Sequence, residues 1–268
     1  MKQRLFKTRE FEKRLRIALF EALPRGWSLS SIAKVYNCQR CRAPLLVLTH
    51  SAGMSPISIL IQHDAYLFAL KLNVPYIMCC LSRQLVGYIF VVNKKYKRDV
   101  VDAVEFFRKL LPYEFIPQNC PRCEFRFEWQ FREADINSLQ FIAPSTTLVD
   151  TIAFETLHRE LAPTNISCID IDAVIYDENY EIVALVEGEI GERNIRKPTT
   201  ILKSLADELK VAALHVCVSH DKQKYFRVLP GGVWFDLNSE NLLKVVKRTR
   251  SLANEKAKKQ DELYQKTN

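Results

Sequence analysis

Four acidic residues flank a hairpin pattern in the second half of the chain, within residues 168–189 (CIDIDAVIYDENYEIVALVEGE). Asp170 and Asp172 open one apolar run, and Glu187 and Glu189 close the next. Side chains alternate along a strand, so the two acids of each pair share a face. Carboxylates are rare at the ends of buried strands unless they are paired or bind an ion. Acids that converge on one sheet edge are ligands that Mg²⁺ accepts, so the segment predicts a divalent-metal site and phosphate chemistry.

The register of this hairpin decides which aspartate lies beside Glu187. A two-residue turn at Glu178 and Asn179 sets Asp170 opposite Glu187, whereas a longer or bulged turn favours Asp172. Either register brings carboxylates within reach of one ion, so we expect Asp170, Asp172 and Glu187 to ligate Mg²⁺ or Mn²⁺. The alternative is that these acids end strands in solvent and pair with nearby basic residues.

The neighbouring elements must position these acids. The expected order is helix 146–161, strand 167–176, strand 181–188, helix 198–210, strand 213–219 and strand 224–229. Glu155 or Glu160 on the first helix would supply a third carboxylate. Lys203 on the second helix is the nearest lysine that could orient an attacking hydroxide or stabilise a pentacovalent phosphate.

This order of elements and acids resembles the PD-(D/E)xK nuclease superfamily over roughly residues 146–235. The resemblance implies a restriction-endonuclease-like mixed sheet flanked by helices. It also implies metal-dependent hydrolysis of DNA phosphodiester bonds, with Asp172 and Glu187 as metal ligands. Glu189 stands where the family usually has lysine, although some restriction endonucleases of the superfamily carry glutamate there. In others the lysine has moved to the following helix, which would make Lys203 its substitute. An inactive copy and an unrelated α/β domain are the alternatives.

Two CxxC pairs occur in matching contexts, Cys38 with Cys41 (NCQRC) and Cys120 with Cys123 (NCPRC). Two such turns supply the four thiolates of a tetrahedral zinc site, and a site closed by four cysteines is structural. The 78 residues between the pairs indicate a zinc ribbon whose two turns flank an inserted α/β block. Two unrelated buried pairs or a redox dithiol would explain the cysteines without a metal.

Positive charge gathers at the two ends of the 268-residue chain, whose net charge is +8. Residues 1–26 and 244–268 each hold eight Lys or Arg and three Asp or Glu. Such ends predict a protein that binds a nucleic acid, with DNA as the expected kind. The chain lacks a long apolar run and a secretory-signal pattern, so we expect an intracellular, cytoplasmic protein without a membrane partner. A zinc protein that binds nucleic acid or another protein without catalysis is the alternative, and a homodimer is left open.

The expected domains are a basic N-terminal helix at 1–30, a zinc-bound α/β domain at 31–128, a nuclease-like domain at 129–250 and a basic polar tail at 251–268, whose end we expect to fray. A helix is expected at about 98–111. Residues 69–92 also match residues 206–229 weakly at a shift of 137 positions. The N-terminal block is therefore a candidate degenerate copy, with His50 and Ala52 where Glu187 and Glu189 stand. Chance similarity between two α/β segments is the alternative.

Overall fold

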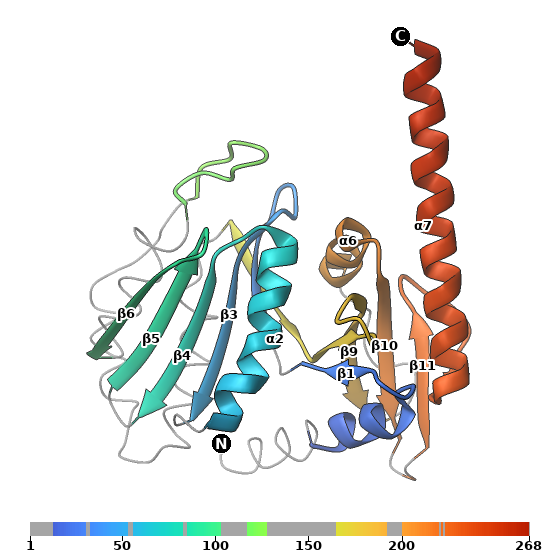
Figure 1. Ribbon diagram of the computed structural model, residues 1–268, viewed down its shortest axis with the longest axis horizontal. Helices are drawn as coiled ribbons and strands as arrows, with labels where there is room; N and C mark the ends of the chain where they lie inside the picture. The colour runs from blue at the N-terminus through green and yellow to red at the C-terminus, as the bar shows by residue number, and fades with distance from the viewer. Residues whose placement is uncertain are drawn as a thin grey trace. The chain divides into compact units, whose positions relative to one another are not determined.

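The computed structural model describes residues 13–30, 33–52, 56–82, 85–102, 117–127, 165–191, 200–219, 221 and 223–267. The expected α/β class is confirmed: helices accompany two mixed sheets (Figure 1). The chain divides into unit 1, Met1–Ser30 with Ile171–Asn268, and unit 2, Ser31–Asp170. Unit 2 is therefore an insertion within unit 1. The division expected at residues 128 and 129 falls inside unit 2 instead.

Sheet B has the strand order β6-β5-β4-β3-β2-β7. Its strands are β2 (Ala33–Cys38), β3 (Pro44–Ala52), β4 (Tyr76–Ser82), β5 (Leu85–Val92), β6 (Lys95–Asp102) and β7 (Ile166–Ile171). Helix α2 (Pro56–Leu72) connects β3 to its parallel neighbour β4. The other described pairs, β2 with β3, β4 with β5 and β5 with β6, are antiparallel.

The helix expected at 98–111 is wrong at its start, because residues 98–102 belong to strand β6. The cause is the turn before it. Asn93 and Lys94 both have positive φ, of 49° and 64°, which is the backbone of a tight hairpin turn. The turn folds β6 back onto β5 along its whole length, and this pairing overrides the helical spacing of the apolar residues.

Sheet A has the strand order β1-β8-β9-β10-β11-β12. Its strands are β1 (Ser28–Leu29), β8 (Ala173–Tyr176), β9 (Ile182–Ile190), β10 (Ala212–Val218), β11 (Lys224–Val228) and β12 (Phe235–Asp236). Helix α6 (Thr200–Leu209) connects β9 to its parallel neighbour β10. The pairs β8 with β9 and β10 with β11 are antiparallel. Sheets A and B therefore share a connection pattern of hairpin, helical crossover and hairpin.

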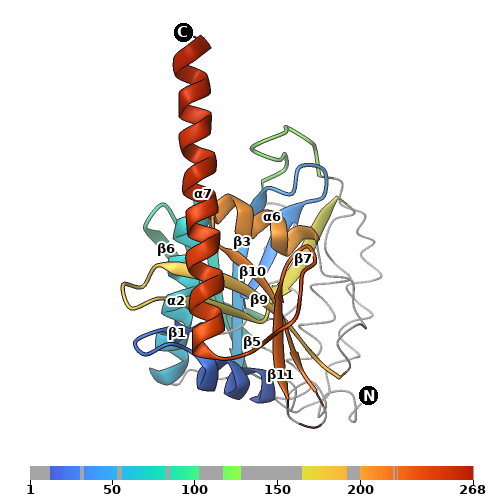
Figure 2. The ribbon, with the colours of Figure 1, turned by 90° about the vertical axis from the view of Figure 1, so that its right-hand side faces the viewer.

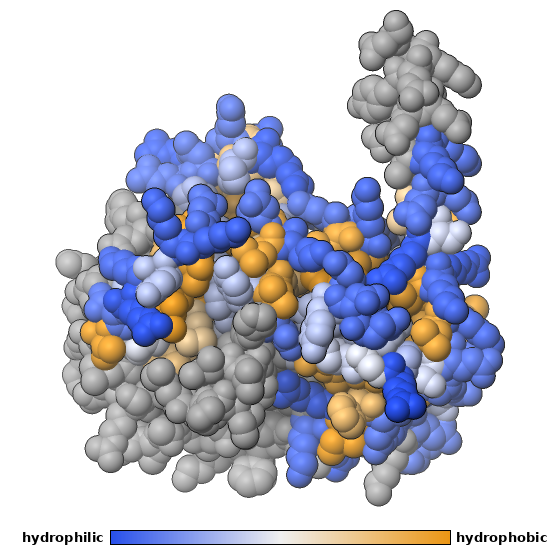
Figure 3. Space-filling view, viewed as in Figure 1, coloured by the Kyte–Doolittle hydropathy of each residue, from blue (hydrophilic) through white to orange (hydrophobic). Residues whose placement is uncertain are grey.

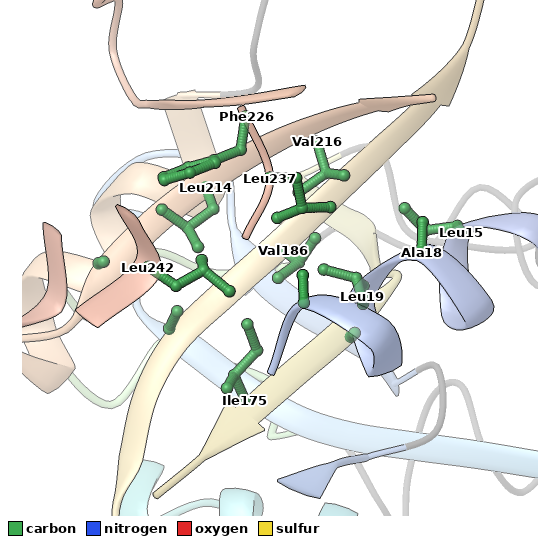
Figure 4. Close-up of a cluster of buried hydrophobic side chains, with 14 of the residues drawn as sticks. Leu15, Ala18, Leu19, Ile175, Val186, Leu214, Val216, Phe226, Leu237 and Leu242 are labelled. Carbon is green, nitrogen blue, oxygen red and sulfur yellow. The ribbon is translucent and has the colours of Figure 1, made fainter. Parts of the chain in front are cut away.

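One face of sheet A packs against the helix at residues 13–22 and against the start of α7 (Ser239–Thr267). The cluster in Figure 4 contains Leu15, Ala18 and Leu19 from the first helix, Ile175, Val186, Leu214, Val216 and Phe226 from the strands, and Leu237 and Leu242 from the start of α7 and the residues before it. Helix α6 contributes nothing to this cluster. Its buried residues Leu202, Leu205 and Ala206 pack on the opposite face of β9 and β10. Sheet A is therefore covered by helices on both faces.

Helix α7 continues to Thr267, so the residues from about 255 that were expected to fray are helical. Its C-terminal half extends beyond sheet A (Figure 2). Within the described part of the chain, no helix combines the length and apolar character needed to cross a membrane.

Gly188 lies in β9 where the helix at residues 13–22 comes closest. A Cβ atom at this position would lie 2.3 Å from Leu15 Cδ2. Leu15 is itself only 1% exposed and cannot swing into solvent. We expect Gly188→Ala to lower the free energy of unfolding by about 1–3 kcal/mol in a urea titration, because an overpacked core must shift backbone or rotamers.

Gly87 in β5 is the matched control. A Cβ atom there would meet its nearest heavy atoms at 3.9 Å, an ordinary contact distance. Gly87→Ala should therefore change the free energy of unfolding by no more than about 0.5 kcal/mol. Equal losses in the two variants would contradict the close packing of Gly188 on Leu15.

Candidate functional site

The strand expected at 167–176 divides into two strands in different sheets. β7 ends at Ile171 in sheet B, and β8 begins at Ala173 in sheet A. Asp170 consequently lies in β7, where its Oδ1 atom is 2.7 Å from Lys34 Nζ. The Lys34 side chain is only 3% exposed, so this acid neutralises a buried cation within unit 2. The structure thus gives Asp170 a partner of its own.

Two irregularities in the hairpin set the register of β8 and β9. Asp177 accepts hydrogen bonds at Oδ1 from the N–H groups of Asn179 and Glu181, and Tyr180 has a φ of 58°, which produces a three-residue loop. The register shifts again between Ile175 and Tyr176. The longer, bulged turn is therefore the one observed, and it is the alternative that favours Asp172.

Asp172 binds β9 on both sides of Glu187. Its N–H group donates to the Val186 carbonyl at 3.0 Å, and its Oδ2 atom accepts a hydrogen bond from the Gly188 N–H group at 2.7 Å. The two acids are therefore neighbours at the point where the chain joins sheet A. Both are partly exposed. For the Gly188 N–H group, the Asp172 carboxylate thus takes the place of a backbone acceptor where the pairing of β8 with β9 begins.

Glu187 and Glu189 lie on the face of sheet A opposite the cluster of Figure 4, together with His215 of β10 and Arg227 of β11. We call Asp172, Glu187, Glu189 and His215 the acid face. His215 pairs with Glu187 in register, and its Nε2 atom lies 3.4 Å from Glu189 Oε2. Glu189 is 7% exposed and His215 is 2% exposed, so this contact is buried.

Arg227 determines which tautomer His215 adopts. Its Nε atom donates to His215 Nδ1 at 3.2 Å, so Nδ1 is an acceptor and the ring proton of a neutral histidine lies on Nε2, facing Glu189. The guanidinium also stacks on Trp234, 4.7 Å from the ring centroid. Burial, and then the positive charge of Arg227, lower the pKa of His215 to about 4. The network therefore joins a buried carboxylate to a cation through a neutral imidazole.

Of the remaining residues predicted for this site, the structure describes Lys203 alone. Lys203 forms an ion pair with Asp207 one turn along α6, and it is not among the buried residues of that helix. Glu155 and Glu160 lie outside the described residues. The described part of the acid face thus contains three carboxylates and a histidine.

The four CxxC cysteines come together in unit 2, as predicted, and we call residues 38–43 and 120–125 the two knuckles. Both have the same backbone. The Cys38 carbonyl accepts from the N–H group of Arg42 and the Cys38 N–H group donates to Ala43, and Cys120 makes the same two bonds with Glu124 and Phe125. Arg42 and Glu124, the fifth residues, have φ of 61° and 56°. Each knuckle is therefore a rigid turn that presents two sulfur atoms.

The sulfur atoms fit a tetrahedral ion. All four lie within 4.8 Å of one another, with 3.8 Å between Cys38 and Cys123 and 3.4 Å between Cys41 and Cys120. A zinc ion with Zn–S bonds of about 2.3 Å needs sulfur atoms about 3.8 Å apart. Burial alone would raise the pKa of Cys120, but backbone N–H groups of Arg122 and Cys123 and the neighbouring thiols lower it to about 7. The cluster could therefore hold a metal ion such as zinc.

The sequence pattern singled out neither His215 nor Arg227. Their role follows only from the alignment of β9, β10 and β11, because His215 pairs with Glu187 on one side and with Arg227 on the other. The one local signal was a polar residue in the otherwise apolar run AALHVCV. A comparison with known protein families, curated proteins and solved structures finds no match. The arrangement of the residues is therefore the whole basis for a function.

Burial of His215 makes a prediction for acid stability. A histidine whose pKa falls from 6.5 unfolded to about 4 folded binds fewer protons in the folded state between these values. Stability is therefore complete above pH 6.5 and declines as the pH falls toward 4, by about 3 kcal/mol from this residue. Urea titrations of metal-free protein across this range should show that decline, and His215→Gln should remove this component. Parallel stability curves for the two proteins would contradict a buried neutral His215.

Proposed function

We propose that the protein is a metal-dependent nuclease that hydrolyses DNA phosphodiester bonds at the acid face of sheet A. The observation that supports this most strongly is the pair of hydrogen bonds by which Asp172 brackets Glu187. They hold two partly exposed carboxylates side by side, with Glu189 two residues further along the same strand. Paired carboxylates beside open solvent are the set that Mg²⁺ uses when it also binds phosphate oxygens.

The topology of unit 1 supports the same proposal. β8, β9, α6 and β10 follow one another in the order expected from the PD-(D/E)xK resemblance, with Asp172 before the first strand and Glu187 in the second. Among the described residues, the helix that precedes the strands of unit 1 is the one at residues 13–22. Glu155 lies outside the described residues and stays a candidate for the third carboxylate.

Asp172 and Glu187 are the residues that would hold Mg²⁺ or Mn²⁺ at this site. A bound ion of this kind would lower the pKa of a water ligand and neutralise charge on the phosphate. Glu189 differs from its two neighbours because it is nearly buried against His215. Glu189 would add negative charge behind the more exposed carboxylates of Asp172 and Glu187. Arg227 would compensate that charge through His215.

A non-catalytic zinc protein that binds nucleic acid or a protein partner is the second candidate. The observation in its favour is the pairing of Lys203 with Asp207, which leaves the described acid face without the lysine usual in the family. Where the partner of the second candidate is nucleic acid, the two candidates differ only in hydrolysis.

We also infer that unit 2 is a degenerate copy of the same fold. Tyr76 of β4 and Ala213 of β10 are 137 positions apart, which is the shift of the sequence repeat. Tyr76 lies on the face of sheet B that α2 covers, and Ala213 lies on the face of sheet A that α6 covers. Their register partners are Val47 and Leu185. Two and four residues further on, Thr49 and Ser51 stand where sheet A has Glu187 and Glu189, so the copy in sheet B lacks the acids. The equivalence expected for His50 and Ala52 is off by one residue.

The nuclease proposal is tested by Glu187→Gln, which keeps the shape of the side chain and removes its charge. Wild-type protein should cleave labelled single-stranded, duplex or branched DNA when Mg²⁺ or Mn²⁺ is present. Glu187→Gln should lower the cleavage rate by about 10²-fold or more, because the ion loses a charged ligand. Gel assays of the labelled products measure both rates.

Glu208→Gln is the matched control, since it removes the same charge from an exposed position on α6. It should cleave like the wild type. If the wild-type protein cuts none of these substrates with either ion, the nuclease proposal fails and the non-catalytic candidate replaces it.

We propose separately that the four-cysteine cluster is a structural zinc site. Coordination by four thiolates leaves no position for a substrate, and the cysteines lie in or against the core of unit 2. Elemental analysis should find about one zinc per chain in wild-type protein and none above background in Cys120→Ser. Cys80→Ser, which lies outside the cluster, should keep the metal. A wild-type chain without zinc would rule out the site.

A further inference from the structure

We infer that the knuckle end of sheet B is a nucleic-acid-binding surface that grips the phosphate backbone. The knuckle end is defined by seven cations, Arg40, Arg42, Lys71, Lys94, Lys95, Arg122 and Arg126. All seven are exposed. This surface belongs to unit 2 and shares no residue with the acid face of unit 1, so the inference does not depend on hydrolysis.

The topology of sheet B brings these cations to one end. β2 finishes and β3 begins at the first knuckle, and the parallel strand β4 begins at that same end, where α2 delivers Lys71. The antiparallel hairpin of β5 and β6 places its turn there too, with Lys94 and Lys95. The second knuckle, with Arg122 and with Arg126 directly after it, lies against the first, because the four sulfur atoms are within 4.8 Å of one another. Segments far apart in the sequence thus add their charges in one place.

The charge at this end is strongly one-sided. Among the described residues of the two knuckles, the end of α2 and the hairpin turn, Glu124 is the single acid. A zinc ion with four thiolates would add two negative charges, and the surface would remain positive. Figure 3 shows hydrophilic side chains over this end of sheet B. A surface with this excess attracts a polyanion and releases its counterions.

The chemistry favours nucleic acid over an acidic protein or a membrane. Four of the seven cations are arginines, whose planar forks match phosphate oxygens. Tyr96, next to Lys95, is 67% exposed with the Arg98 guanidinium 5.2 Å from its ring centroid, and Arg40 lies over Phe125 at 5.4 Å. Phe125 is half-buried against the core of unit 2, whereas Tyr96 is an exposed ring beside cations, which is a platform on which an unpaired base stacks. The described surface here lacks the broad apolar face by which a helix inserts into a bilayer.

The test compares two triple variants of equal charge. The knuckle-end variant removes three charges by Lys95→Gln, Arg122→Gln and Arg126→Gln. Arg42 and Lys94 are left unchanged because their positive φ restricts substitution. The comparison variant removes three exposed charges from α7 by Lys247→Gln, Arg248→Gln and Lys258→Gln. Helix α7 forms the basic C-terminal end of the chain, which the charge distribution in the sequence predicts to bind DNA. Both sets are made in the Glu187→Gln chain without added Mg²⁺ or Mn²⁺, so hydrolysis cannot consume the probe.

Fluorescence anisotropy with a labelled DNA strand, single and as a duplex, gives the dissociation constant over a salt series. The knuckle-end variant should bind at least about tenfold more weakly near 100 mM salt, and the slope of log affinity against log salt should become shallower by about 2–3. The α7 variant should change both values much less. Retained zinc content and circular dichroism show that the knuckle-end variant is folded. Arg122→Lys with Arg126→Lys, which keeps the charge but loses the planar forks, should bind DNA more tightly than the knuckle-end variant and more weakly than the parent.

Three results would overturn the inference. The first is a larger loss in the α7 variant than in the knuckle-end variant, and the second is unchanged DNA binding when the three knuckle-end charges are gone. The third is binding to anionic phosphatidylserine vesicles with none to DNA. Failure of DNA cleavage by the wild-type protein would remove the nuclease proposal and leave this binding result unaffected.

Discussion

The hydrogen bond from the Gly188 N–H group to the Asp172 carboxylate holds the acid face of sheet A in place. At Asp172 the chain has just left sheet B, and where the pairing of β8 with β9 begins the Asp172 carboxylate supplies the acceptor for the Gly188 N–H group. On the other face of β9, Gly188 has no room for a side chain because Leu15 packs directly against it. Gly188 therefore both donates the hydrogen bond to Asp172 and allows the helix at residues 13–22 to pack closely on β9. The positions of Glu187 and Glu189, on either side of it, follow from that constraint.

Local patterns were sufficient for elements whose apolar spacing agrees with their final environment. Helix α6 and strands β9, β10 and β11 lie close to where the sequence placed them. The pattern failed at β6, where a tight turn at Asn93 and Lys94 decided the structure, and at residues 167–176, which read as one strand. The division at Asp172 depends on pairing with β2 on one side and with β9 on the other. A short stretch of sequence does not reveal these pairings. It does not reveal the two irregularities that set the register of β9 either.

The predicted acids illustrate the same limit at the level of chemistry. Asp170 and Asp172 are equivalent in sequence, yet Asp170 neutralises the buried Lys34 while Asp172 lies beside Glu187. The sequence offered Lys203 as the cation nearest to these acids. In the structure the cation linked to Glu189 is instead Arg227 of β11, two strands away from β9, and the link runs through a neutral His215. A buried carboxylate is stable only with such a partner, so the partner had to exist, but its identity depended on the sheet.

The insertion of unit 2 is compatible with an ordered acid face because its two ends are held together. Ser30, fully buried, donates its N–H group to the Val174 carbonyl at 2.9 Å and accepts the Val174 N–H group at Oγ at 3.0 Å. The chain thus leaves sheet A at β1 and returns at β8 within one strand pair. An insertion whose ends are already adjacent adds little loop-closure entropy to the folding of its host. Unit 2 can consequently carry its own knuckles and its own charged surface, while the register that sets Asp172 against β9 depends only on bonds within unit 1.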